Sequence, residues 1–99
     1  MTLDNALEVL RRSAPELKSR YGVIGARLFG SVARGDADEV SDVDVAVVFE
    51  GGHPTDVMSL CGVSGLLSTL FEKAVDVVAL PARDPALAAV LERDGVGAF

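Results

Sequence analysis

The stretch GSVARGDADEVSDVD, residues 30–44, lies between two apolar runs and decides the fold of this chain. The runs at 23–29 and 42–50 predict two strands, joined by a short helix over 31–35 and a loop over 37–41. The connection is too short for a long crossover helix, so we expect an antiparallel or mixed pair. Gly30 and Ser31 then lie at one end of the sheet, where backbone N–H groups and a hydroxyl can approach an anion such as a phosphate.

Asp42 and Asp44 stand two residues apart on a segment that is predicted to be extended. Strand alternation directs both carboxylates to one face, where they repel each other unless a cation lies between them. Mg²⁺ with a bound nucleotide is the expected occupant, because Mg²⁺ takes one or two carboxylates plus substrate phosphates. The alternative is that the pair only marks the entry to an edge strand. The nearly continuous apolar run after Asp44 favours instead a strand that is covered on both faces.

A third acid, Asp76, interrupts the apolar run 74–80, which predicts a third strand. Alternation places Asp76 on one face with Val78 and Leu80, while Val75, Val77 and Ala79 share the other. The acid is either exposed at a sheet edge or paired laterally with the strand that carries Asp42 and Asp44. We favour the second interpretation, because an unpaired acid inside an apolar strand needs a partner.

The spacing of these residues resembles the signature of the polymerase-beta-like nucleotidyltransferase superfamily. Gly30-Ser31 is followed, after ten residues, by Asp42-Val43-Asp44. The fuller pattern, FGSVARG at 29–35 with SDVD at 41–44, resembles the small branch of minimal nucleotidyltransferase (MNT) domains, closely over about residues 24–50 and more loosely elsewhere. The resemblance implies an α+β fold, with a small mixed sheet of three or more strands flanked by helices, in a single domain over residues 1–99.

The same resemblance implies a Mg²⁺-dependent enzyme that moves AMP from ATP to a hydroxyl acceptor and releases pyrophosphate. Two Mg²⁺ ions would be held by three carboxylates, and the phosphates would be bound near the glycine-serine turn. The implied catalytic and metal-binding residues are Asp42, Asp44 and Asp76, and the implied phosphate-binding residues are Gly30, Ser31 and Arg34. Taken without the resemblance, Arg34 is equally a surface residue.

The acceptor follows from the resemblance to one half of a bacterial two-gene pair, whose other product is an all-helical HEPN toxin. An MNT member of such a pair resembles a type VII-like antitoxin that adenylylates a tyrosine of its HEPN partner. A chain of 99 residues has little room for a substrate domain, which fits a protein acceptor. Two alternatives stay open: an antitoxin that masks its partner without catalysis, and the catalytic subunit of a two-subunit enzyme that modifies a small molecule.

Composition narrows the class of protein. The 9 basic and 15 acidic residues give a net charge of -6, so no direct binding to DNA is expected. The longest apolar stretch is too short for a membrane span, and no positively charged, apolar leader is present at the N-terminus. One cysteine, Cys61, excludes an internal disulfide, and we expect a cytoplasmic protein.

Further helices flank the predicted strands. Apolar spacing predicts a helix over 3–13, a break at Ser13-Ala14-Pro15-Glu16, and a short second helix to Tyr21. A boundary at 51–54, in which His53 is a loop residue, precedes a helix from Thr55 or Asp56 to Lys73. Its expected core residues are Val57, Leu60, Cys61, Leu67, Leu70 and Phe71. Asp84 is expected to cap a last helix, and residues 95–99 form an extended tail.

Overall fold

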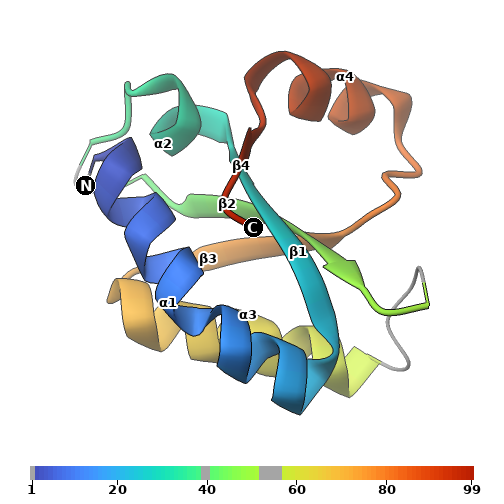
Figure 1. Cartoon of the computed structure of the whole chain (residues 1–99). Coiled ribbons are helices and arrows are strands. Elements are labelled where there is room, and N and C mark those ends of the chain that lie inside the picture. Colours follow the sequence, from blue (N-terminus) through green and yellow to red (C-terminus); the bar gives the residue numbers. More distant parts are fainter. Residues whose placement is uncertain (1, 39–40, 52–56) are drawn as a thin grey trace.

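The computed structural model describes residues 2–38, 41–51 and 57–99 of the chain, and helices and strands alternate along it. Within these residues the strands form one sheet in the order β3-β2-β1-β4 (Figure 1). Strand β1 is antiparallel to β2 and to β4, whereas β2 and β3 are parallel. The mixed α+β fold is therefore confirmed. The elements are α1 (Leu3–Tyr21), β1 (Val23–Phe29), α2 (Gly30–Arg34), β2 (Val43–Phe49), α3 (Val57–Phe71), β3 (Val75–Ala79), α4 (Pro85–Asp94) and β4 (Val96–Gly97).

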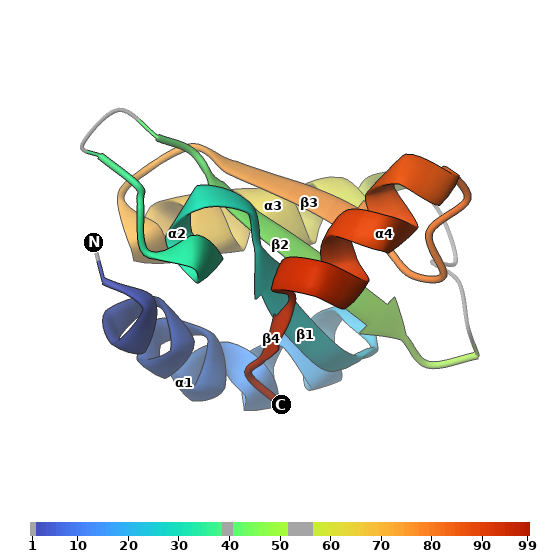
Figure 2. The same ribbon diagram turned by 90° about the horizontal axis from the view of Figure 1, so that it is seen from above.

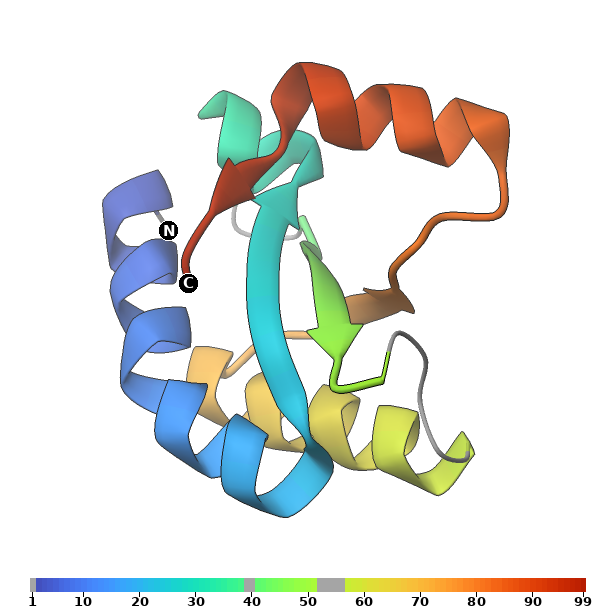
Figure 3. The same ribbon diagram turned by 45° about the vertical axis from the view of Figure 1, so that its right-hand side comes forward.

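Strand alternation assigns each sheet face to a different set of helices. One face carries Val43, Val45 and Val47 of β2 and packs against α1 and α3 in the main core. The other face carries Phe29 and Ala46, which pack against Leu91 of α4. Viewed from above, α4 crosses over β2 and β1 (Figure 2), whereas α1 and α3 lie on the opposite side of the sheet (Figure 3). The predicted division of β3 is confirmed, since Val75, Val77 and Ala79 join the main core and Val78 and Leu80 join the α4 cluster.

The predicted break near Pro15 is wrong, because α1 is one helix from Leu3 to Tyr21. Ser13 does not cap a second helix; its buried hydroxyl donates to the carbonyl of Leu10 at 2.7 Å. Pro15 removes one helical hydrogen bond, at a cost of about 3 kcal/mol. The side chains of Leu10 and Leu17, both 0% exposed, hold the two halves of the helix to the same core. Burying two leucines contributes roughly 3–6 kcal/mol, which offsets the proline.

The buried face of α3 also differs from the prediction. Phe71 and Leu67 are buried as expected, but Cys61 is exposed and Leu70 is 45% exposed. The core contact runs through Val63, Leu67 and Phe71 at a spacing of four residues. Nearly every position of this helix is apolar or small, so its hydrophobic pattern does not mark one face. Residues 52–56, including His53 and the expected cap at Thr55 or Asp56, lie outside the described residues.

The C-terminal segment is more than the predicted extended tail, because it adds strand β4 beside β1. Arg11 of α1 donates from Nε to the carbonyl of Ala98 at 3.0 Å and fixes this segment against the helix. Before it, Asp84 caps α4 as predicted, and its carboxylate accepts a hydrogen bond from the N–H of Ala86 at 2.9 Å.

Candidate functional site

The sheet places two acids of the sequence motif next to each other at one end. In the ladder between β1 and β2, Asp44 lies opposite Phe29, the last residue before Gly30. In the ladder between β2 and β3, Asp44 lies beside Asp76. Asp44 and Asp76 therefore project from neighbouring strands onto the face that carries α4, and the predicted lateral pairing of Asp76 is confirmed.

Gly30 lies against the Asp44 carboxylate of this pair and has no room for a side chain. Its φ is +73°, in the left-handed region that favours glycine. A β-carbon built at this position would overlap Oδ2 of Asp44. The absence of a side chain at Gly30 therefore allows the turn after β1 to approach the Asp44 carboxylate directly.

The electrostatics of Asp44 indicate a place for a cation. Partial burial raises the pKa of this carboxyl above its ordinary value, and the negative charges of Asp76 and Asp42 raise it further. Arg34 acts in the opposite direction. Asp42 and Asp76 are both exposed. The site thus brings the negative charges of two exposed acids, Asp42 and Asp76, close to the half-buried Asp44.

The donor set fits a hard cation such as Mg²⁺, which prefers carboxylate oxygens. Within the described residues, however, no three acidic, histidine or cysteine side chains are grouped closely enough to hold a metal ion by themselves. The three aspartates are electrostatic neighbours and not a closed ligand set. This arrangement matches a cation that also takes oxygens from a bound substrate.

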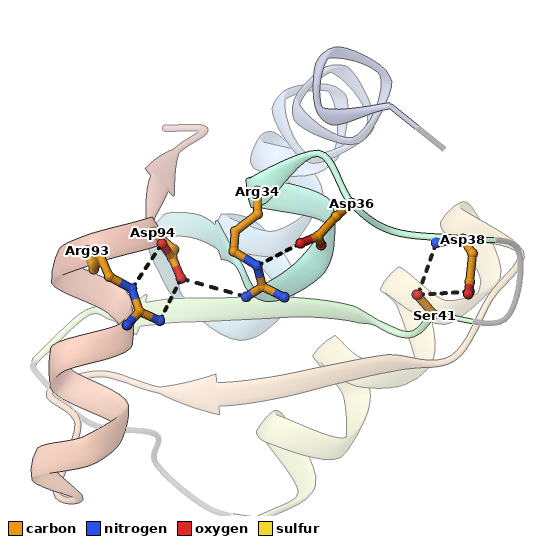
Figure 4. A network of polar contacts seen from close by, with 6 residues as sticks. All are labelled: Arg34, Asp36, Asp38, Ser41, Arg93 and Asp94. Atoms are coloured by element: carbon orange, nitrogen blue, oxygen red, sulfur yellow. Dashed lines mark hydrogen bonds and ion pairs between the residues drawn. The ribbon is translucent and has the colours of Figure 1, made fainter.

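Arg34 lies at the end of α2 and is held between two carboxylates from different parts of the chain (Figure 4). Its Nε donates to Asp36 at 3.2 Å, and its Nη1 lies 3.7 Å from Oδ2 of Asp94 at the end of α4. Asp36 first, and Asp94 after it, raise the pKa of Arg34 above the ordinary value. Ser31 lies one turn earlier on α2 and is half-buried. Of the two predicted polar residues of the turn, Arg34 is near enough to Asp44 to affect its pKa.

The loop before Asp42 is tied down by a cation that the sequence did not identify. Lys73, between α3 and β3, donates to the carbonyl of Asp38 at 3.3 Å. Ser41 exchanges hydrogen bonds with the same aspartate, at 3.0 and 3.1 Å (Figure 4). Asp36 and Asp38 are exposed, and Glu39 lies outside the described residues. A lysine directly before the strand of Asp76 was the only available signal for this contact.

None of the helices described is both long and apolar enough to span a membrane.

Comparison with known families gives one match that extends over most of the chain. The sequence profile of the nucleotidyltransferase domain matches residues 10–93. A candidate protein adenylyltransferase of Methanocaldococcus jannaschii is 35% identical over 77 residues, which cover 78% of this chain and 76% of that protein. The protein adenylyltransferase MntA of Thermococcus cleftensis is 44% identical over 50 residues, or half of each chain.

Solved structures share the fold. A candidate minimal nucleotidyltransferase superposes with a TM-score of 0.74 at 33% identity, over 97% of this chain and 95% of that one. A toxin–antitoxin complex with AMP-PNP gives 0.73 at 21% identity, over 90% and 72% of the two chains. A complex of a tri-AMPylated HEPN toxin of Shewanella oneidensis with its MNT antitoxin gives 0.66 at 18% identity, over 94% and 71%.

Proposed function

Because this chain belongs to the nucleotidyltransferase domain family and is an adenylyltransferase, we propose that it transfers AMP from ATP to a hydroxyl group of a partner protein, with Mg²⁺. The observation that carries this proposal is the lateral pair of Asp44 and Asp76, in which Asp44 lies against Gly30, where the turn after β1 has no side chain. The pair offers oxygen ligands, and the turn offers backbone groups beside them.

In this proposal Asp42, Asp44 and Asp76 hold two Mg²⁺ ions, which neutralise the triphosphate and polarise the reacting phosphorus when bound. Gly30 and Ser31 bind the β- and γ-phosphates, and Arg34 adds a positive charge beside them. Asp76 lies on an edge strand and is exposed, so an acceptor hydroxyl can approach it from outside. Asp76 takes the proton of that hydroxyl as the hydroxyl oxygen attacks the α-phosphorus. The bond from the α-phosphorus to the bridging oxygen breaks, and pyrophosphate leaves.

The acceptor that we propose is a tyrosine of a HEPN toxin, so that this chain acts as the antitoxin of the pair. Two lines support the partner: a relative named protein adenylyltransferase MntA, and a similar fold in the complex of an MNT antitoxin with an AMPylated HEPN toxin. In this chain, Asp76 is exposed on the edge strand β3, so the hydroxyl group of a partner protein can reach it.

The test uses α-labelled ATP, Mg²⁺ and a HEPN-type protein of the kind seen with an MNT antitoxin in the solved complex. Wild type is compared with Asp42→Ala/Asp44→Ala and with Glu50→Ala, which removes an exposed acid just beyond the opposite end of β2. We expect label on the partner with wild type and Glu50→Ala, and none with the double variant. No label with any form, with tight binding of the partner by all of them, would leave a masking antitoxin. Label on a small molecule alone would indicate the two-subunit enzyme.

A further inference from the structure

Asp94 is a nearly buried carboxylate outside the sequence motif. Its side chain is 11% exposed, although it stands at the end of a surface helix. Arg93 donates to both of its oxygens, from Nε at 3.2 Å and from Nη2 at 3.1 Å (Figure 4). Arg93 is the main reason that the pKa of Asp94 lies below its ordinary value. Arg34 lowers this pKa further, to a smaller extent, so Arg93 is the principal and Arg34 the lesser cationic partner of Asp94.

The sheet fixes Asp94 at the same end as the candidate site. Strand β4 begins two residues after Asp94, and its Val96 pairs with Leu28 of β1. Strand β1 ends at Phe29 and leads directly into Gly30 and α2. Asp94 and the turn are thus both positioned by the end of one strand. Asp36, the other partner of Arg34, is 61% exposed in a loop, whereas the side chain of Asp94 is 11% exposed at the end of a helix.

Two of the three guanidinium nitrogens of Arg34 are engaged by these carboxylates. Nε donates to Asp36 at 3.2 Å, and Nη1 lies 3.7 Å from Asp94. A planar guanidinium that is held at two nitrogens has a fixed direction for the third. Arg34 is also near enough to Asp44 to oppose the rise in the pKa of that acid.

We propose that Asp94 is a positioning residue, which acts through Arg34 and holds its guanidinium in one orientation for the phosphates of the nucleotide. This inference rests on the proposed function, since it assumes that ATP binds beside Asp44. Asp94 itself touches no substrate. The ion pair with Asp94 restricts the rotamers of the Arg34 side chain before the nucleotide binds. Arg34 therefore loses less conformational entropy when a phosphate binds.

The test is a double-mutant cycle on MgATP binding, measured by calorimetry. Arg34→Ala is expected to weaken binding by about tenfold, and Asp94→Asn by roughly three- to tenfold, as for loss of a charge-assisted contact. In the Arg34→Ala background, Asp94→Asn should have no further effect, because a positioning residue has nothing left to position. Glu92→Gln, which removes an exposed acid of the same helix, should leave binding unchanged.

Asp94→Glu provides a second variant that keeps the charge. It shifts the carboxylate by one methylene, so it should weaken MgATP binding as well, whereas a purely electrostatic role would leave binding intact. Equal effects of Asp94→Asn with and without Arg34, or unaltered binding in both Asp94 variants, would overturn the inference. Wild-type protein that does not bind MgATP would instead overturn the proposed function.

Discussion

Replacing Gly30 by alanine should disable the candidate site far more than it destabilises the fold. The new β-carbon adds left-handed backbone strain of about 1–2 kcal/mol, because φ at this residue is +73°. It also overlaps the Asp44 carboxylate. To restore an ordinary contact distance, that carboxylate must move by on the order of 1 Å. Forcing it off its rotamer costs roughly another 0.5–1.5 kcal/mol.

Gly22→Ala is the matched control for this change. Gly22 has the same φ of +73° at the end of α1, but a β-carbon built there meets nothing within 4 Å. Both variants place an alanine at the same φ, so the difference between them reports mainly the contact with Asp44. At about 4–8 °C per kcal/mol for a domain of this size, Gly22→Ala should lower the melting temperature by roughly 5–15 °C, and Gly30→Ala by somewhat more.

The two variants should separate clearly in activity. Displacing a catalytic carboxylate by about 1 Å reduces the rate of transfer by on the order of 100-fold. We therefore expect Gly30→Ala to lose about two orders of magnitude in AMP transfer from labelled ATP at a temperature where it is still folded, and Gly22→Ala to keep wild-type activity. Activity of Gly30→Ala within a few-fold of Gly22→Ala would refute the argument that Gly30 positions Asp44.

Three further predictions concern stability. The pKa of Asp44 is raised by burial, Asp76 and Asp42, so the folded state binds this proton more tightly than the unfolded chain. Without metal, the free energy of unfolding should then fall as the pH rises from the ordinary pKa of an aspartate toward the raised pKa of Asp44. Urea unfolding in EDTA measures this loss, and Asp44→Asn should remove it. Glu72→Gly should stabilise by about 1 kcal/mol, because Glu72 has a φ of +56°. Gly62→Ala should destabilise, since its β-carbon overlaps the Tyr21 ring, whereas Gly65→Ala, in open space, should stabilise by up to about 1 kcal/mol in thermal melts.

The strands and their contribution to the site were predictable because period-two alternation is a local property. Once residues 42–50 and 74–80 are assigned as strands, each acid can be placed on a face before the fold is known. Only the register had to come from the structure. The parallel pairing of Asp44 with Asp76 then converts two separate sequence signals into one acid pair.

The helices were less predictable, because their outcome depends on packing partners that are distant in the sequence. A proline with a preceding serine and a following glutamate is a good local signal for a new helix. In α1 the contacts of Leu10 and Leu17 with the core outweigh this signal. In α3, Gly62 leaves space for the Tyr21 ring of α1, a contact that no local pattern around Gly62 reveals.

Arg34 shows why a motif identifies a residue more readily than its environment. The motif places a cation near the phosphates, but the contact with Asp94 joins positions 60 residues apart in the chain. That contact exists because β4 returns the chain to the end of β1, and the sequence of 95–99 indicated only an extended tail. Long-range strand pairing, and not local propensity, supplies the second partner of this arginine.

The end of the sheet organises the site as a row across its strands. Asp76 on β3 lies beside Asp44 on β2, Asp44 lies opposite Phe29 at the end of β1, and Asp94 stands just before β4. Neighbouring strands are about 4.8 Å apart. The strand pairing therefore sets the spacing between the acid pair, the turn at Gly30 and the contact of Arg34 with Asp94. Substitutions that shift the register of β1 against β2 should therefore abolish activity even where every residue of the motif is retained, because a slip of one position turns Asp44 toward the opposite face.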